Sequence, residues 1–93
     1  MVGHAGDGNL HPTVIVDPND PESLAAAHLA FEEIATFALR HGGTVTGEHG
    51  VGLLKVGLLE QELEPVAAEL QRRVKEAFDP GYLLNPGKVL TRP

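Results

Sequence analysis

Apolar residues recur at helical spacing in the stretch that follows Asp20. Asp20 suits an N-cap, Pro21 suits the first helical position, and Glu22 is favoured near the positive end of the helix dipole. The apolar positions of this stretch, mostly three or four residues apart, are Leu24, Ala27, Phe31, Ile34, Ala35 and Ala38. Gly42 and Gly43 favour a helix end. The pattern therefore predicts one long helix between Asp20 and Gly42.

Two more stretches of helical spacing lie in the second half of the chain. Between residues 51 and 63, the leucines predict a short helix that Gly57 interrupts or delays. Pro65 favours the start of another helix, which Asp79-Pro80-Gly81 ends. The tail from residue 82 to residue 90 is apolar enough to dock against the rest of the chain. The apolar stripe of the helix after Pro65 comprises Val66, Leu70, Val74, Ala77 and Phe78.

Short β-branched runs precede and follow the long helix. Residues 13–16 read Thr-Val-Ile-Val and residues 44–46 read Thr-Val-Thr, which favours strands. A strand, a helix and a strand in this order predict a right-handed crossover between parallel strands of one sheet. We therefore expect one α+β domain over residues 1–93, with strand, helix and strand followed by C-terminal helices.

Composition narrows the function classes. The net charge of −6 argues against a nucleic-acid partner, and one Tyr, three Phe and no Trp leave few platforms for base stacking. Without cysteine, neither thiolate metal sites nor disulfides can form, which fits a reducing compartment and predicts a cytoplasmic protein. No apolar run approaches the ~20 residues of a membrane span.

Imidazoles and a carboxylate stand among glycines at two places. In residues 3–11, Gly-His-Ala-Gly-Asp-Gly-Asn-Leu-His, three glycines within six residues disfavour a regular helix. His4 and His11 therefore meet only if the loop folds back. The second place is residues 47–50, Gly-Glu-His-Gly, after the second predicted strand. One register of the predicted parallel sheet places His11 and Glu48 on the same face.

Two imidazoles and one carboxylate form the ligand set of an open divalent-metal site, and they suit Zn²⁺, Fe²⁺ or Mn²⁺. His4 and His11, together with one carboxylate, would supply this set. His49 follows Glu48 in what we expect to be an extended chain, so it would point away and not be a primary ligand. The alternative is that both motifs are glycine-rich turns with surface histidines. Two such motifs in so short a chain favour the metal site.

Two other histidines belong to the predicted long helix. His28 lies at the edge of its apolar stripe, and His41 lies in its last turn, where an imidazole suits the helix dipole. We predict structural roles for both.

The two glycine-rich motifs and two later motifs carry a resemblance to a known family. They are residues 3–12, residues 43–52, Phe78-Asp79-Pro80, and the Leu-Asn-Pro-Gly-Lys of residues 84–88. In this order and spacing they resemble the C-terminal part of FAD-linked oxidases of the vanillyl-alcohol-oxidase-like superfamily. Within that superfamily, the chain resembles the D-lactate/D-2-hydroxyacid dehydrogenases and the flavin-bearing subunit of bacterial glycolate oxidase. The resemblance runs from Gly3 to Leu90.

The resemblance implies a fold and roles for individual residues. The chain would be a fragment of a ferredoxin-like cap domain. His4, His11 and Glu48 match the ligands of a divalent metal beside the flavin. His49 matches the candidate catalytic base that faces the substrate, and Asn85 matches a flavin contact. These roles are what the family's motifs imply for the matching positions of this sequence.

The resemblance also implies what would surround this chain. FAD would be the cofactor of the full-length enzyme and a small 2-hydroxy acid its substrate. Some relatives carry a polar amide where this chain has Thr13, so the resemblance does not imply which 2-hydroxy acid is used. In the family an FAD-binding domain precedes this part, and we expect residues 1–93 to represent only the portion that follows it.

We therefore expect the substrate- and metal-binding portion of a flavin-dependent 2-hydroxyacid oxidoreductase, inactive alone. Its partner would be an FAD-binding domain, upstream or on another chain. Exposed apolar surface and sheet edge would favour a homo-oligomer. The alternative function is a stand-alone metal-binding or protein-interaction module derived from the same cap.

Overall fold

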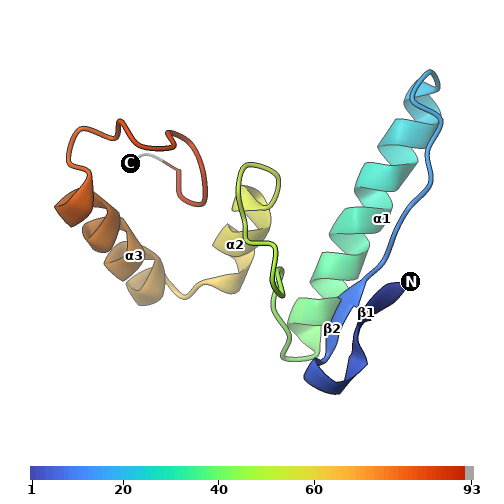
Figure 1. The fold of residues 1–93 in the computed structure, drawn as a ribbon, viewed down its shortest axis with the longest axis horizontal. Helices are drawn as coiled ribbons and strands as arrows, with labels where there is room; N and C mark the ends of the chain where they lie inside the picture. The colour runs from blue at the N-terminus through green and yellow to red at the C-terminus, as the bar shows by residue number, and fades with distance from the viewer. Residues whose placement is uncertain (92–93) are drawn as a thin grey trace. The chain divides into compact units, whose positions relative to one another are not determined.

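The computed structural model describes residues 1–91 and forms two compact units, divided between His49 and Gly50. In the described residues there are two strands, one short 3₁₀ helix and three α-helices. The first unit contains the strands and the longest helix, and the second contains the two shorter α-helices and the tail (Figure 1). The α+β class predicted from the sequence is thus confirmed.

The first unit begins with a β-hairpin. Strands β1 (Val2–His4) and β2 (Asn9–His11) pair antiparallel, and the 3₁₀ helix η1 (Ala5–Asp7) connects them. Gly8 adopts a φ of +72°, a left-handed conformation that glycine enters without steric cost. The glycine-rich segment therefore folds back on itself, which is the condition under which His4 and His11 can meet.

Helix α1 (Pro21–Arg40) has the boundaries that the sequence predicts. The Asp20 side chain accepts a hydrogen bond of 3.0 Å from the Glu22 amide and so caps the helix start. At the other end, Gly42 has a φ of +75° and the Gly43 amide donates to the Ala38 carbonyl at 2.8 Å. This glycine-dependent closure satisfies carbonyls that the last helical turn would leave unpaired.

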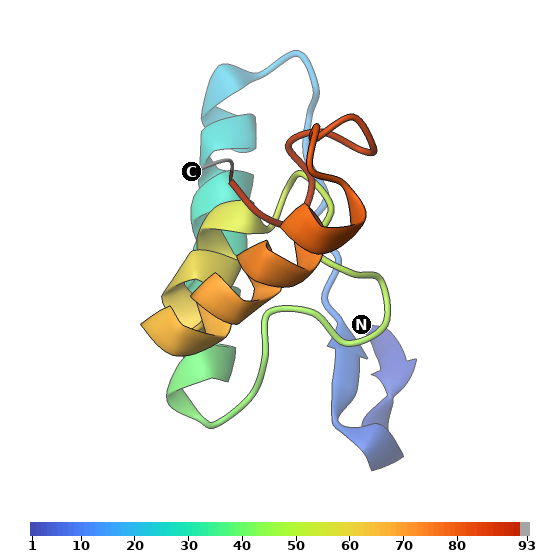
Figure 2. The same ribbon diagram turned by 90° about the vertical axis from the view of Figure 1, so that its left-hand side faces the viewer.

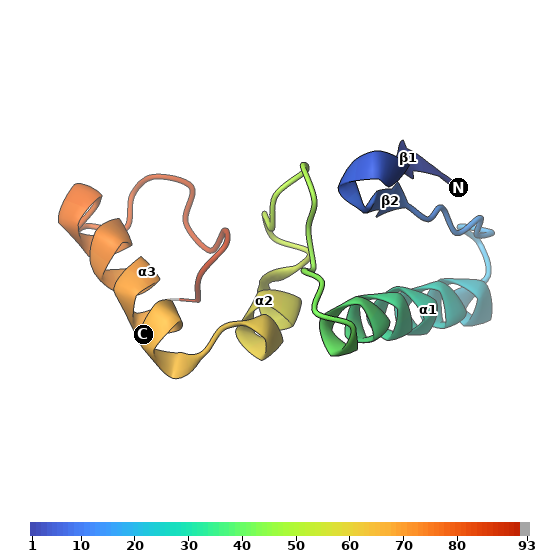
Figure 3. The same cartoon turned by 90° about the horizontal axis from the view of Figure 1, so that it is seen from below.

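The two β-branched runs do not form strands, so the predicted strand–helix–strand crossover with parallel pairing is wrong. Residues 13–16 run back along α1 toward its N-terminal end without a ladder partner (Figures 1 and 3). The Ile15 side chain is 93% exposed and Val14 is 44% exposed. High β-propensity reflects a fit to a pleated, half-buried surface, and this segment packs on no such surface. Residues 44–46 likewise form no strand.

The second unit consists of α2 (Val56–Glu62), α3 (Pro65–Phe78) and the tail. Because α2 begins at Val56, Gly57 lies in its first turn, and the helix continues through this residue without the predicted interruption. The tail leaves α3 and turns back toward that helix (Figure 2). The Val89 amide donates to the Gly52 carbonyl at 2.7 Å, which confirms that the tail docks within this unit.

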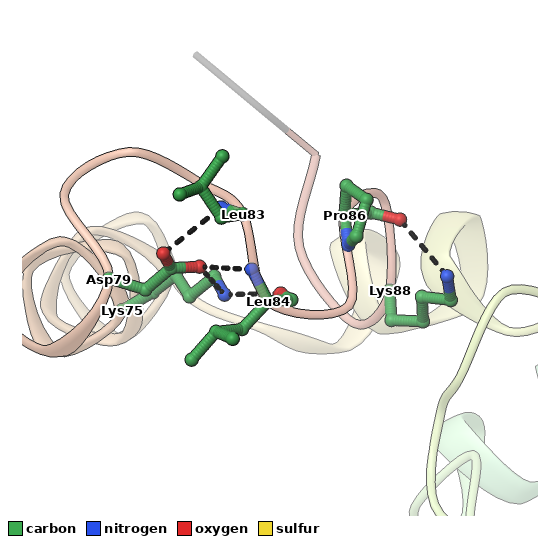
Figure 4. A network of polar contacts seen from close by, with 6 residues as sticks. All are labelled: Lys75, Asp79, Leu83, Leu84, Pro86 and Lys88. Atoms are coloured by element: carbon green, nitrogen blue, oxygen red, sulfur yellow. Dashed lines mark hydrogen bonds and ion pairs between the residues drawn. The ribbon is translucent and has the colours of Figure 1, made fainter.

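Asp79 holds the turn between α3 and the tail (Figure 4). Its carboxylate, 6% exposed, accepts hydrogen bonds of 3.0 Å from the amides of Leu83 and Leu84. Lys75 Nζ donates to the same carboxylate and to the Leu84 carbonyl, at 2.5 and 2.8 Å. The Lys75 side chain, followed by the two amides, lowers the pKa of Asp79 below its ordinary value.

This network predicts acid-dependent loosening of the tail. Because the pKa of Asp79 is lowered in the folded state, its contribution to stability is present above the unfolded-state value of ~3.9. That contribution is lost as pH falls through the folded-state pKa. We expect Asp79→Asn to lower stability at neutral pH and to weaken this acid dependence. Tyr82, the only tyrosine, provides a fluorescence signal for the measurement. Glu76→Gln, a charge change at an exposed position of α3, is the control, and equal behaviour of both variants would contradict the prediction.

Few apolar side chains are buried within the described residues. The buried ones are Ala35, Val45 and Leu58. The predicted stripe of α3 is instead solvent-exposed, and its four largest members are 53–85% exposed: Val66, Leu70, Val74 and Phe78. None of the helices in residues 1–91 combines the length and apolarity needed to cross a membrane.

Candidate metal centre

The hairpin places both of its histidines on one face. The register pairs Val2 with His11 and His4 with Asn9. Since side chains alternate along a strand, His4, Asn9 and His11 lie on the same face of the ribbon, with the two histidines diagonal to each other. Their ring centroids are 6.5 Å apart in an edge-to-face arrangement.

The loop after α1 brings Glu48 to this face. Val45, 8% exposed, anchors the loop, and the chain bends through residues 47–49. A side chain on Gly47 would meet the Asn9 side chain, because its Cβ would lie 2.2 Å from the Asn9 amide oxygen. The bare backbone of Gly47 thus lies directly against Asn9, beside the two hairpin histidines. Close approach of backbone to side chain here requires glycine.

Three imidazoles converge on one carboxylate oxygen. Glu48 Oε1 lies 2.8 Å from His11 Nε2 and 3.8 Å from the Nε2 atoms of both His4 and His49. The His11 and His49 rings stack, with centroids 4.8 Å apart and planes 28° apart. His11 is the most covered of the four side chains at 27% exposed, whereas Glu48 is 46%, His4 64% and His49 70% exposed. The cluster is therefore accessible to solvent.

The donor set fits a divalent ion. One ligand atom each from His11, Glu48 and His49 lie within 4.8 Å of one another. Four donors placed tetrahedrally ~2.1 Å from an ion would be about 3.4 Å apart, which lies between the 2.8 and 3.8 Å contacts observed. Imidazole nitrogen with carboxylate oxygen is a combination that Zn²⁺, Fe²⁺ and Mn²⁺ accept. His4 is not part of this group of mutually close ligand atoms, and its ring centroid lies 6.5 Å from that of His11.

The structure brings together His4, His11 and Glu48, the three residues that the sequence predicts as metal ligands, although by another route. The sequence predicts that a pair of parallel strands brings these residues together. In the structure, the antiparallel hairpin and the bent loop do so instead. The expectation that His49 points away from Glu48 is wrong. Alternation of side chains holds for extended backbone, and the bend at residues 47–49 turns both side chains to the same point.

Asn9 is a site-forming residue that the sequence reasoning missed. Its position two residues before His11 would have indicated the same face of a strand, had the strand been placed at residues 9–11. Its role is to seat the Gly47 backbone, which carries Glu48 and His49.

Asn85, the predicted flavin contact, belongs to the second unit. It has a φ of +45°, a left-handed conformation that Asn tolerates better than most residues. It is exposed and lines an open cavity of about 530 Å³ together with Leu70 and Val74 of α3. No ligand role for it follows from this geometry.

The two histidines of the α1 region lie outside the cluster. His41 Nδ1 donates to the Phe37 carbonyl at 2.8 Å, and its ring stacks on Phe37 at 4.1 Å. This contact at the helix end agrees with the structural role predicted for His41. His28 lies exposed on α1.

Comparison with known proteins places the sequence in a family. Residues 1–89 match the family model described as FAD linked oxidases, C-terminal domain. The chain is 47% identical over 90 residues to a probable mitochondrial D-lactate dehydrogenase of Danio rerio. It is 46% identical over 90 residues to the glycolate oxidase subunit GlcD of Bacillus subtilis, and 40% identical over 87 residues to GlcD of Escherichia coli K12.

These alignments cover nearly the whole chain but a small part of each relative. They include 97%, 97% and 94% of this chain, and 18%, 19% and 17% of the respective relatives. The chain thus spans less than a fifth of the length of these proteins. With a family match over residues 1–89, it belongs to the C-terminal domain family of FAD-linked oxidases.

Proposed function

We propose that this chain is the substrate- and metal-binding portion of a flavin-dependent 2-hydroxyacid oxidoreductase of the glycolate or D-lactate type. The observation that carries the proposal is the convergence of His4, His11 and His49 on one oxygen of Glu48. Relatives named D-lactate dehydrogenase and glycolate oxidase subunit support the substrate class.

The four residues divide into two roles in this proposal. His4, His11 and Glu48 hold a divalent metal, which would stabilise negative charge developing on the substrate hydroxyl oxygen. His49 is the catalytic base that accepts the hydroxyl proton at Nε2. With 70% of its side chain exposed, it can meet a substrate from the solvent side. An imidazole suits this role because it exchanges protons near neutral pH.

The proposal also requires FAD and a second domain. FAD would accept the hydride, and most of its binding contacts would come from an FAD-binding domain upstream or on another chain. Asn85 is proposed as one contact from this chain, since its exposed amide offers both a donor and an acceptor. On this basis the isolated chain would neither retain FAD nor oxidise 2-hydroxy acids, and the cytoplasm remains the proposed location.

A second candidate function is a stand-alone metal-binding or protein-interaction module. The exposed apolar stripe of α3 favours it, because contiguous apolar surface marks interaction sites. The same exposed stripe supports the proposed homo-oligomer, because association would bury its apolar side chains. Light scattering over a concentration series tests this oligomer. Restoration of 2-hydroxyacid oxidation by an added FAD-binding domain would distinguish the enzyme portion from such a module.

Calorimetric titration of the purified chain with Zn²⁺ or Mn²⁺ tests the metal centre. We expect one ion per chain. We expect His11→Ala to weaken binding by roughly 100-fold. Losing an outer-shell partner of a metal site costs about 10- to 100-fold in affinity, and losing a direct ligand should cost at least as much as the upper end of that range. His28→Ala removes an exposed imidazole from α1 and should leave the affinity unchanged. Equal affinities of wild type and both variants would refute a metal centre at the cluster.

A further inference from the structure

His49 occupies a position that a base alone would not require. Its Nε2 atom lies 3.8 Å from Glu48 Oε1, the same distance as that of His4. The three ligand atoms that lie within 4.8 Å of one another belong to His11, Glu48 and His49. By mutual distance, His49 is therefore at least as well placed as His4 to bind an ion held by His11 and Glu48.

Ring stacking and chain connectivity hold His49 in this position. Its imidazole stacks on that of His11 at 4.8 Å, so both rings present Nε2 to the same carboxylate oxygen. His49 also follows Glu48 directly, and the bend of residues 47–49 positions both side chains together. His4, by contrast, is the last residue of the three-residue strand β1, and its ring meets that of His11 edge-on without stacking.

We propose that His49 is a ligand of the same divalent ion in the substrate-free protein. This inference rests on the proposed metal centre and extends it. The lone pair of Nε2 that binds an ion is the one that would accept a proton, so His49 can act as a base only after it leaves the ion. A 2-hydroxy acid has carboxylate and hydroxyl oxygens that compete with imidazole for a divalent ion. Substrate binding would then release the base.

Zinc titration followed in parallel by calorimetry and by NMR of the imidazole signals tests this inference. In the wild type, the signals of His49 and His11 should change together and saturate at one equivalent of Zn²⁺. His49→Ala should weaken Zn²⁺ binding by roughly 100-fold, as expected for His11→Ala, because losing a direct ligand should cost at least as much as losing a supporting group. His28→Ala is the matched control for loss of an exposed imidazole. Glycolate added to the zinc complex should shift the His49 signals back toward their metal-free positions.

The possible outcomes separate this inference from the proposed function. If His49→Ala binds Zn²⁺ like wild type while His11→Ala does not, the metal centre stands and His49 is not a ligand. If the wild type binds no Zn²⁺, both the centre and the inference are refuted. His49 signals that ignore Zn²⁺ while those of His11 respond would also overturn the inference. This NMR readout needs no variant, so a folding defect in His49→Ala cannot obscure the result.

Discussion

Replacing Gly47 with alanine is expected to separate the two halves of the metal centre. The new Cβ would lie 2.2 Å from the Asn9 amide oxygen and 2.6 Å from its amide carbon, distances that non-bonded atoms do not adopt. Either the Asn9 side chain or the loop that carries Glu48 must move. Movement of the loop displaces Glu48 and His49, and movement of the Asn9 side chain disturbs the face that it shares with His4 and His11. We expect Zn²⁺ affinity, measured by calorimetry, to fall by roughly 10- to 100-fold.

A second substitution and a matched glycine make this prediction specific. Gly6→Ala is the control, because a Cβ there meets no atom within 4 Å. Asn9→Gly removes the obstructing amide, so the double variant Gly47→Ala/Asn9→Gly should recover part of the lost affinity, a coupling that a double-mutant cycle measures. The same loss in Gly6→Ala, or strictly additive effects in the cycle, would show that close packing at Gly47 does not position the site.

Glu48→Gln is expected to abolish most metal binding with little change in fold. Glu48 Oε1 is the atom on which the three imidazoles converge, and the glutamine amide keeps its size but loses its charge. A neutral amide oxygen is a weaker ligand for Zn²⁺ or Mn²⁺ than a carboxylate, and it leaves the ion's charge less balanced. We expect a loss of ~100-fold or more in affinity, beyond the effect typical of an outer-shell group.

Glu32→Gln provides the corresponding control for charge. Glu32 lies exposed on α1 of the same unit, so its substitution changes the net charge equally without touching the cluster. Because Glu48 is 46% exposed, circular dichroism of Glu48→Gln should match that of wild type without metal. Wild-type metal affinity in Glu48→Gln would mean that the imidazoles alone bind the ion, and the proposed role of the carboxylate would be wrong.

Local sequence determined the helices of this protein. The cap at Asp20, the prolines at helix starts and the glycines after α1 act on residues a few positions away, so their effect can be predicted without knowing the tertiary structure. The glycines likewise predicted that residues 3–11 form no regular helix, and Gly8 permits the turn by its left-handed backbone. The residue types of the candidate centre, imidazoles with a carboxylate, were equally visible.

Tertiary structure alone decided where the strands lie. The run of residues 13–16 has strong β-propensity but no partner strand among the described residues, whereas the hairpin formed in residues with weaker propensity. A strand exists only through pairing with a neighbour, and the sequence of one segment does not specify its neighbour. Predicting parallel pairing across α1 was wrong for this reason.

Tertiary structure also decided which donors meet. The sequence indicated that His4, His11 and Glu48 could share an ion, and the hairpin register and the seating of Gly47 on Asn9 bring them together. The direction of His49 depended on a backbone bend at residues 47–49, which reversed the expected alternation. Spacing along a chain fixes side-chain direction only where the backbone is regular, and this loop is not.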